Sequence, residues 1–175
     1  MTRLLTMHRT AHRLLPLALV AGVACDKGLA PMPQPTSCPP DVVGICGTVT
    51  FAGAEPANTD GVFIIAYHTF PQSTADLYSF VPAPPLQSLP RPFTGSYSYT
   101  IGVPNGRYEW VVAVWKRVGL LIPDNLEEAG FYRDQAVPTQ PGIVVVNGTV
   151  TDAIDFVIDF DNMHPVCFYI PPCPP

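Results

Sequence analysis

Short runs of apolar residues, many alternating with polar ones, fill the chain from Gly47 to about Asp161 and are separated by Gly, Pro and Asn. Period-two alternation predicts half-buried strands, whereas a continuous apolar run predicts a strand covered on both faces. The run Val62–Tyr67 is of the second kind. The predicted strands are Thr48–Phe51, Val62–Tyr67, Tyr97–Val103, Tyr108–Lys116, Ile143–Val146 and Val150–Phe160.

Two Asn-Gly dipeptides stand between predicted strands, and Asn-Gly is a strong hairpin signal. Asn105-Gly106 predicts that Tyr97–Val103 pairs with Tyr108–Lys116. Asn147-Gly148 predicts a second pair, between Ile143–Val146 and Val150–Phe160.

The final predicted strand separates its side chains by polarity. Ile154, Phe156, Ile158 and Phe160 fall on one side, and Asp155, Val157, Asp159 and Asp161 on the other. We therefore expect the first set to enter a core and the acidic set to face water.

Helical periodicity is missing between the strands, and Asn125–Gly130 is expected to form a single helical turn at most. Asp124, Glu127 and Glu128 accordingly read as an exposed loop. About seven short strands predict an all-β fold, a single antiparallel Greek-key β-sandwich over residues 46–161. Residues 68–94 hold six prolines and are expected to be irregular apart from a short strand at Leu77–Val81, with either a functional or a merely mobile role.

The N-terminus has the layout of a bacterial secretory signal. Arg3, Arg9 and Arg13 precede the apolar run Leu14–Ala24, which at eleven residues is shorter than the about 20 needed to span a bilayer. Cys25 follows small residues and resembles the lipidated cysteine of a lipobox, which predicts a signal peptide over 1–24. Plain cleavage and a buried Cys25 are the alternatives.

Proline plus glycine make up 35 of the 175 residues, and many of the prolines lie at the two ends of the domain. Residues 25–45 are expected to form the lipidated cysteine and a Pro-rich tether, and 162–175 a Pro/Cys-rich tail.

Removal of residues 1–24 leaves six basic and fourteen acidic residues, a net charge of −8. Nucleic-acid binding needs clustered basic residues, and the only adjacent pair is Lys116-Arg117, so we expect no nucleic-acid partner.

Four cysteines remain after Cys25, an even number that suits two disulfides in an oxidising compartment. Their spacing lacks the C-x2-C pairs of a zinc ribbon. The local pairs Cys38–Cys46 and Cys167–Cys173 would each close a Pro-rich end. The nested pairs Cys38–Cys173 and Cys46–Cys167 would tie the termini together.

Four segments together resemble the carboxypeptidase regulatory-like, or prealbumin-like (transthyretin-like), domain: Gly47–Phe51, Pro104–Tyr108, Ala129–Tyr132 and Ile154–Phe160. Such domains are common in bacterial envelope lipoproteins. The resemblance covers most of residues 46–161 and implies a β-sandwich with an accessory role rather than a reaction.

Candidate catalytic residues are few. Past the signal the histidines are His68 and His164, which read as surface or strand-end residues, and no G-x-S-x-G, H-E-x-x-H or Walker motif occurs. Prealbumin-like hydrolases of 5-hydroxyisourate end in Tyr-Arg-Gly-Ser, whereas this chain continues from Tyr169 as Ile-Pro-Pro-Cys-Pro-Pro. We expect no catalysis and no cofactor.

Two residue sets are weaker candidates for binding. Asp159 and Asp161 share one strand face and are weak Ca²⁺ ligands, with a solvated strand face as the alternative. Tyr108 and Trp110, predicted to share a face with Trp115 opposite, form a ligand platform for a glycan or a protein if exposed, and core packing if buried.

The sequence therefore predicts a lipid-anchored protein of the bacterial cell envelope, outside the cytoplasm, held to a membrane by its N-terminal lipid. Its expected role is non-catalytic, as a binding or structural module with an envelope protein or glycan as partner. A glycan-binding module and a small hydrolase or accessory subunit of an envelope enzyme are the alternatives.

Overall fold

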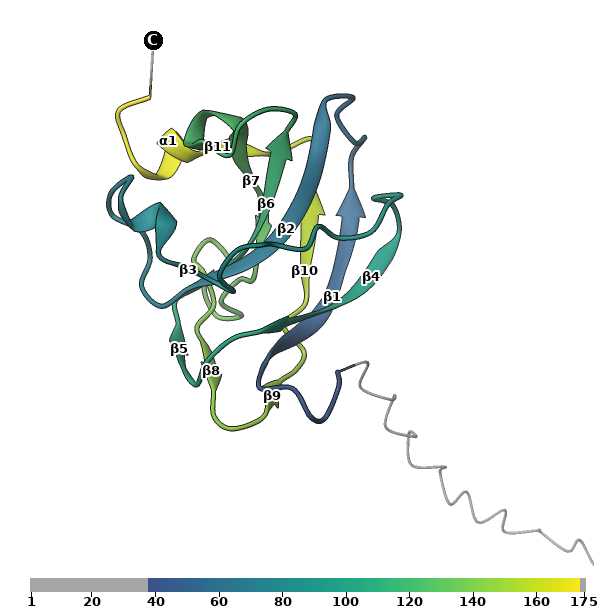
Figure 1. Ribbon diagram of the computed structural model, residues 1–175, viewed down its shortest axis with the longest axis vertical. Coiled ribbons are helices and arrows are strands. Elements are labelled where there is room, and N and C mark those ends of the chain that lie inside the picture. The colour runs from purple at the N-terminus through teal and green to yellow at the C-terminus, as the bar shows by residue number, and fades with distance from the viewer. Residues whose placement is uncertain (1–37, 174–175) are drawn as a thin grey trace, which may run out of the picture. The chain divides into compact units, whose positions relative to one another are not determined.

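The computed structural model describes residues 38–173, which form a sandwich-like arrangement of β-sheets and confirm the predicted all-β class (Figure 1). The first sheet has the strand order β10-β1-β4, with β9 also paired to β1. The second has the order β11-β7-β6-β2-β3, and β5 and β8 form a separate two-stranded ribbon. The strands are β1 Gly44–Ala52, β2 Thr59–Tyr67, β3 Phe80–Val81, β4 Ser96–Gly102, β5 Gly106–Tyr108, β6 Trp110–Arg117, β7 Leu126–Phe131, β8 Val144–Val146, β9 Val150–Thr151, β10 Phe156–Asp159 and β11 His164–Pro165.

The main core takes side chains from both larger sheets. Ile45 and Val49 of β1 pack in the same cluster as Val62 of β2 and Val111 of β6, and all four are fully buried. The polarity of the last strand is confirmed. The core-side residues are Ile154, Phe156, Ile158 and Phe160.

The second sheet also buries apolar side chains on its other face. In β2, Ile65 and Tyr67 join Trp110 and Val112 of β6 and Phe131 of β7 in a second cluster. Because successive strand residues point to opposite faces, two clusters on alternate residues mean that β2 and β6 are covered on both sides, as predicted for Val62–Tyr67.

The predicted hairpin across Asn105-Gly106 is wrong. β4 pairs with β1 in the first sheet, whereas β6 pairs with β2 and β7 in the second. The reason lies in the polarity of the strands: β6 is apolar on both faces and needs a central place, whereas β4 has exposed residues and lies at an edge. The intervening turn crosses between sheets, and Tyr108 Oη donates to the Pro104 carbonyl at 2.6 Å to hold it.

The second predicted hairpin is also wrong. β8 pairs with β5, whereas β9 and β10 pair in parallel with β1, so the sandwich is not wholly antiparallel. The two Asn-Gly turns contact each other instead, since Gly148 N–H donates to Asn105 Oδ1 at 2.7 Å.

Two further segments differ from the sequence prediction. Leu126–Phe131 is strand β7 rather than a helical turn or an exposed loop, and it follows a 3₁₀ turn at Pro123–Asn125. The expected strand at Leu77–Val81 shortens to β3, preceded by a 3₁₀ turn at Asp76–Tyr78.

The C-terminal segment folds onto the second sheet. β11 pairs with β7, and α1 (Val166–Tyr169) follows it directly (Figure 1). The Pro/Cys-rich tail is therefore part of the domain up to Cys173. The C-terminal segment thereby brings side chains such as that of Tyr169 beside the outer face of β6 and β7.

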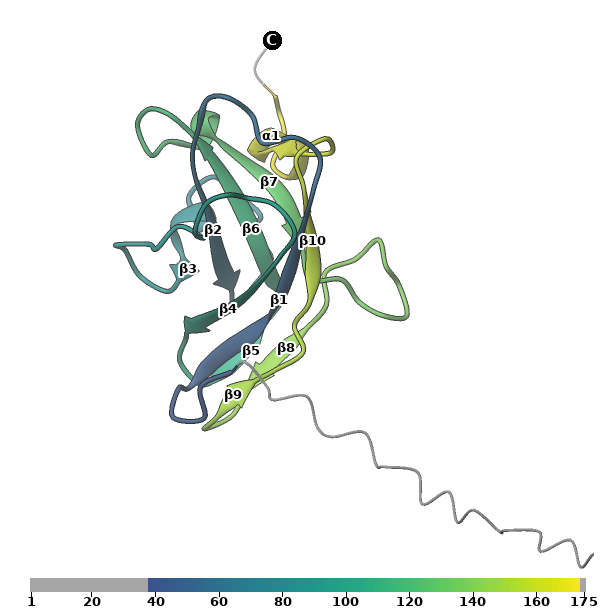
Figure 2. The same ribbon diagram turned by 90° about the vertical axis from the view of Figure 1, so that its right-hand side faces the viewer.

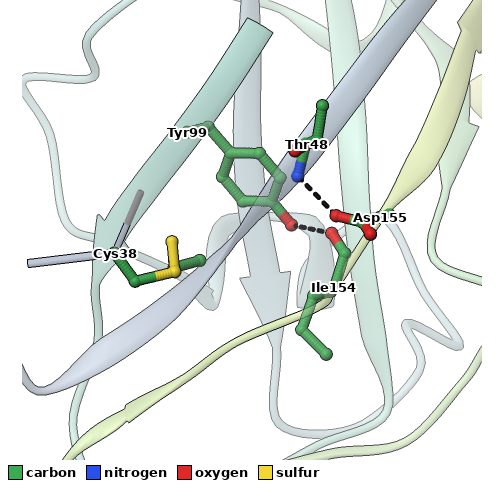
Figure 3. The surroundings of a disulfide bond; sticks show 6 residues. Cys38, Thr48, Tyr99, Ile154 and Asp155 are labelled. Atoms are coloured by element: carbon green, nitrogen blue, oxygen red, sulfur yellow. Dashed lines mark hydrogen bonds between the residues drawn. A yellow bond between two sulfur atoms is a disulfide. The ribbon is translucent and has the colours of Figure 1, made fainter. Parts of the chain in front are cut away.

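The disulfides are the local pairs, Cys38–Cys46 and Cys167–Cys173. Figure 3 shows the first beside two bonds that hold the chain before β10: Tyr99 Oη donates to the Ile154 carbonyl at 2.7 Å, and Thr48 N–H donates to Asp155 Oδ1 at 2.6 Å. Disulfides persist in oxidising compartments, so the two pairs indicate a compartment outside the cytoplasm.

Candidate functional site

An apolar groove crosses the outer face of the second sheet, on the side away from the main core. Its floor consists of alternate residues of the two central strands and of β7. The floor residues are Phe63, Ile65 and Tyr67 of β2, Trp110, Val112 and Val114 of β6, and Leu126 and Glu128 of β7. The strands are paired on both sides here, so the floor offers side chains and no free backbone edge.

Three separate segments wall the groove. Pro71, Leu77, Tyr78, Phe80 and Leu86 come from the Pro-rich stretch, Leu121, Ile122 and Pro123 from the β6–β7 loop, and Val166, Tyr169 and Ile170 from the C-terminal segment. Figure 2 shows the β6–β7 loop and the C-terminal segment at the same end of the domain, opposite the end that holds β9. The cavity between the walls has a volume of about 80 Å³.

Nearly all of the groove surface is apolar, and its rim includes exposed apolar side chains. Leu121 is 53% exposed, Ile122 41% and Tyr78 65%. Isolated surface apolar residues are ordinary, but a patch continuous with an apolar groove marks a binding surface.

Trp110 carries a polar atom without a partner in a groove whose lining also includes the carboxylates of Glu127 and Glu128. Its ring lies between Phe70 and Tyr169, with centroid distances of 4.8 and 5.2 Å. Within residues 38–173, its indole Nε1 is the one buried side-chain nitrogen or oxygen without a hydrogen-bond partner. Buried donors are normally paired, so this one calls for an explanation.

Glu128 fastens the C-terminal wall. Its carboxylate is buried on β7, where Oε2 accepts from Tyr169 Oη at 2.7 Å and contacts His164 Nδ1 at 2.9 Å. Burial raises the pKa of Tyr169, and the bond to Glu128 raises it further. The tyrosine therefore stays protonated and keeps donating.

Two partly exposed carboxylates hold the opposite wall in place. Glu109 accepts from the Phe70 N–H at 3.2 Å, and Asp76 accepts from the N–H groups of Gln72 and Ser73 at 3.0 and 2.9 Å. The Phe70 bond is the main reason that the pKa of Glu109 is lowered, and the Gln72 bond has the same effect on Asp76. Residues 68–78 are thus held by specific bonds.

The predicted ligand platform does not exist as an exposed surface. Tyr108 is 0% exposed, Trp110 5% and Trp115 3%, which is the core-packing alternative. Tyr108 and Trp115 lie in the main core and Trp110 in the outer cluster, because Glu109 separates β5 from β6 and the alternation does not continue through it. Only Trp110 lines the groove.

The two histidines lie in unrelated settings. His68 is exposed, stacks on Tyr108 and contacts the Arg107 carbonyl at 3.0 Å. His164 contacts Glu128 and the rings of Phe168 and Tyr169. A His-Glu pair needs a nucleophile to act on, and the hydroxyl beside it, that of Tyr169, already donates to Glu128.

The weak Ca²⁺ candidates serve the turn after β10. Asp159 Oδ1 accepts from Asp161 N–H at 3.0 Å, and Oδ2 accepts from the Asn162 amide at 2.6 Å. Within the part of the chain that the structure describes, no cluster of three or more His, Cys, Asp and Glu side chains is placed to hold a metal ion.

The signal peptide, Cys25 and most of the tether lie outside the described residues. Among residues 38–173, no helix has the length and apolar character to cross a membrane. Comparisons with protein-family models, curated proteins and solved structures gave no match.

Sequence reasoning missed the groove because its residues come from five separate segments. Two features of the sequence could have indicated it. The strands β2 and β6 are continuously apolar, so both of their faces need apolar neighbours, and the loop Val118–Pro123 is apolar although the structure shows it exposed.

Proposed function

We propose that this protein is a lipid-anchored binding module of the bacterial cell envelope, and that the groove over β2, β6 and β7 holds an apolar ligand. The observation that carries the proposal is the open, almost wholly apolar groove with its exposed rim at Leu121 and Ile122. Ligand sites are concave and mostly apolar, with few polar groups.

The secretory layout of residues 1–24 and the position of Cys25 support the envelope location. The two disulfides are compatible with it. The carboxypeptidase regulatory-like resemblance supports an accessory role. Two carboxylates line the groove, Glu127 and Glu128, and the hydroxyl beside Glu128, that of Tyr169, is held as its donor, which suits binding without catalysis.

The anchor is tested by labelling cells with radioactive palmitate. We expect the label to enter the wild-type protein and to be lost in Cys25→Ser. Equal labelling of both proteins would disprove lipidation at Cys25.

The groove is tested with the uncharged fluorophore N-phenyl-1-naphthylamine, whose emission rises in apolar sites. Leu121→Asp places a charge on the groove wall and should weaken binding at least tenfold. Leu120→Asp is the matched control, since Leu120 is 75% exposed in the same loop and does not line the groove. Wild-type protein that leaves the emission unchanged, or a loss of binding that is equal in the two variants, would count against the groove as the site.

A further inference from the structure

We infer that the free edge of β4 is a second binding site, which takes an extended segment of another protein as an added strand. This edge belongs to the first sheet, whereas the groove lies on the outer face of the second sheet. The inference therefore goes beyond the proposed function and does not depend on it.

The backbone of β4 is paired on one side. Within residues 38–173 its partner is β1, in an unbroken antiparallel register. Just beyond the two ends of β4, the Phe51 N–H donates to the Gly95 carbonyl at 2.8 Å and the Val103 N–H donates to the Val43 carbonyl at 3.3 Å. Backbone bonds in an antiparallel pair alternate along the strand, so the odd-numbered residues of β4 bond to β1. The N–H and C=O groups that point to the free edge belong to Ser96, Ser98, Thr100 and Gly102.

The β4 edge lacks the features that usually protect an edge strand. Proteins keep such strands short or give them charges, prolines or bulges, because an open edge attracts further strands. Among the other edge strands of the two larger sheets, β3, β9 and β11 have two residues each and β10 has four. β4 has seven residues, with no charge, no proline and no register shift. It is therefore open to pairing with a further strand.

An uncharged cleft lies beside this edge. Its volume is about 320 Å³, which is within the range of about 300–1,000 Å³ for binding pockets. The cleft is lined by Ile64 of β2, Pro82, residues 85–90, and residues 97 and 99–102 of β4, none of which is charged. On the opposite side of the sandwich, β7 and β10 approach so closely that a Cβ on Gly130 would lie 2.0 Å from the Val157 carbonyl oxygen. The sandwich is thus open beside β4 and closed beside β10.

The edge and the cleft together define the chemistry of the ligand. Alternate side chains of an added strand would point to the same face of the sheet as Tyr99, which faces the main core. These side chains would enter the cleft, where a charge would lose water without gaining a partner. The side chains between them would lie beside Ser98 and Thr100 and can be polar. The ligand is therefore an extended segment with apolar residues at alternate positions, bound by strand addition.

A second copy of this chain fits the edge less well. If two β4 strands paired, the side chains offered to the cleft would be those of the partner's inner face, Tyr97, Tyr99 and Ile101. Tyr99 is 4% exposed, and its hydroxyl already donates to the Ile154 carbonyl of its own chain. Ile101 packs against its own main core. The cleft would stay empty, so a separate segment with free side chains is the better ligand.

The first experiment measures amide hydrogen exchange by NMR on residues 25–175 with Cys25→Ser. In the protein alone, the Ser98 and Thr100 amides should exchange at least tenfold faster than those of Tyr99 and Ile101, which bond to β1. Slow exchange at Ser98 and Thr100 would show that the edge is already covered. If the slowing grew with protein concentration, the cover would be a second copy. Either result would overturn the inference.

The second experiment adds a peptide as the strand. The probe is Lys-Thr-Val-Thr-Phe-Thr-Val-Thr-Lys, and its control is Lys-Val-Thr-Thr-Phe-Val-Thr-Thr-Lys, which has the same composition without the alternation. We expect the alternating peptide to slow exchange at Ser96, Ser98, Thr100 and Gly102 at least tenfold. The control peptide should bind about tenfold more weakly. Failure of the alternating peptide to bind, or binding that leaves these amides unchanged, would overturn the inference.

Matched variants locate the peptide. Ser98→Pro removes one free N–H that does not bond to β1 and should weaken binding about tenfold, whereas Ser98→Ala keeps that N–H and should bind as the wild type does. Gln87→Asp places a charge in the cleft and should also weaken binding about tenfold. Ala83→Asp is its control, because Ala83 is exposed in the same stretch and does not line the cleft.

Leu121→Asp separates this site from the groove. It should leave peptide binding unchanged, because Leu121 lines the groove and not the cleft. Peptide binding that is lost in Leu121→Asp and kept in Gln87→Asp would place the peptide in the groove and overturn the inference while the proposed function stands. Equal binding by Gln87→Asp and Ala83→Asp would likewise overturn it, whether or not Ser98→Pro folds.

Discussion

The hydroxyl of Tyr169 lies 2.7 Å from Glu128 Oε2 and so ties the C-terminal segment to the outer face of the second sheet. Because Glu128 is buried, its carboxylate depends on such donors in place of water. One wall of the groove therefore depends on a bond between residues 41 positions apart.

Tyr169→Phe should keep the ring against Trp110 and remove this bond. Hydrogen bonds to charged groups contribute about 1.5–3 kcal/mol, so we expect the free energy of unfolding in urea to fall by an amount in that range. Tyr132→Phe is the control, because within residues 38–173 the Tyr132 hydroxyl forms no hydrogen bond. Equal stability of wild type and Tyr169→Phe would show that the C-terminal segment docks without this bond.

Tyr99→Phe should destabilise the junction before β10. The Tyr99 hydroxyl donates to the buried Ile154 carbonyl, which would lose its side-chain partner at a cost of about 1–3 kcal/mol. Tyr97→Phe, two residues earlier on β4 and 39% exposed, should change the unfolding free energy by less than about 0.5 kcal/mol. Similar losses in the two variants would refute a specific role for the Tyr99 bond.

Gly130→Ala should be among the most damaging small substitutions. A Cβ at Gly130 would lie 2.0 Å from the Val157 carbonyl oxygen, and the φ angle of +156° disfavours L-residues. We expect the free energy of unfolding, measured with urea, to fall by more than about 3 kcal/mol, because backbone atoms around Val157 would have to shift to admit the Cβ. Gly148→Ala, with φ +76° and no atom within 4 Å, isolates the backbone effect and should cost about 1 kcal/mol.

Acid should loosen the wall formed by residues 68–78. The pKa values of Asp76 and Glu109 are lowered from 3.8 and 4.5 by bonds from backbone N–H groups. A lowered pKa in the folded state means that the stabilisation is complete above the ordinary value and is lost as the pH falls through the lowered one.

The measurement is an NMR titration of the Phe70, Gln72 and Ser73 amide signals from pH 6 downward. We expect the chemical shifts of these amides to change once the pH falls below the ordinary carboxyl pKa values. The shifts of core amides such as that of Val112 should stay constant. In Asp76→Asn, the Gln72 and Ser73 signals should no longer respond to acid. A response that persists unchanged in this variant would assign the effect to another group.

Residue patterns determined much of the local structure. Alternation in Ile154–Phe160 identified the buried face of that strand. The continuous apolar run at Val62–Tyr67 identified a strand that is buried on both faces. Both are properties of neighbouring residues, because the direction of a side chain in a strand follows from its position. The short spacing of Cys38–Cys46 and Cys167–Cys173 made the local pairs plausible but did not decide between them and the nested ones.

Tertiary structure decided which strands pair. Asn105-Gly106 and Asn147-Gly148 favour tight turns. However, β6 pairs with β2 and β7 in the middle of the second sheet, where one of its apolar faces is buried in the main core and the other in the outer cluster, and this burial outweighs a local turn preference. The break at Glu109 likewise placed Tyr108 and Trp110 in different clusters. The groove needed β2, β6, β7, residues 68–86 and the C-terminal segment to meet, and long-range contacts of that kind leave no periodic trace in the sequence.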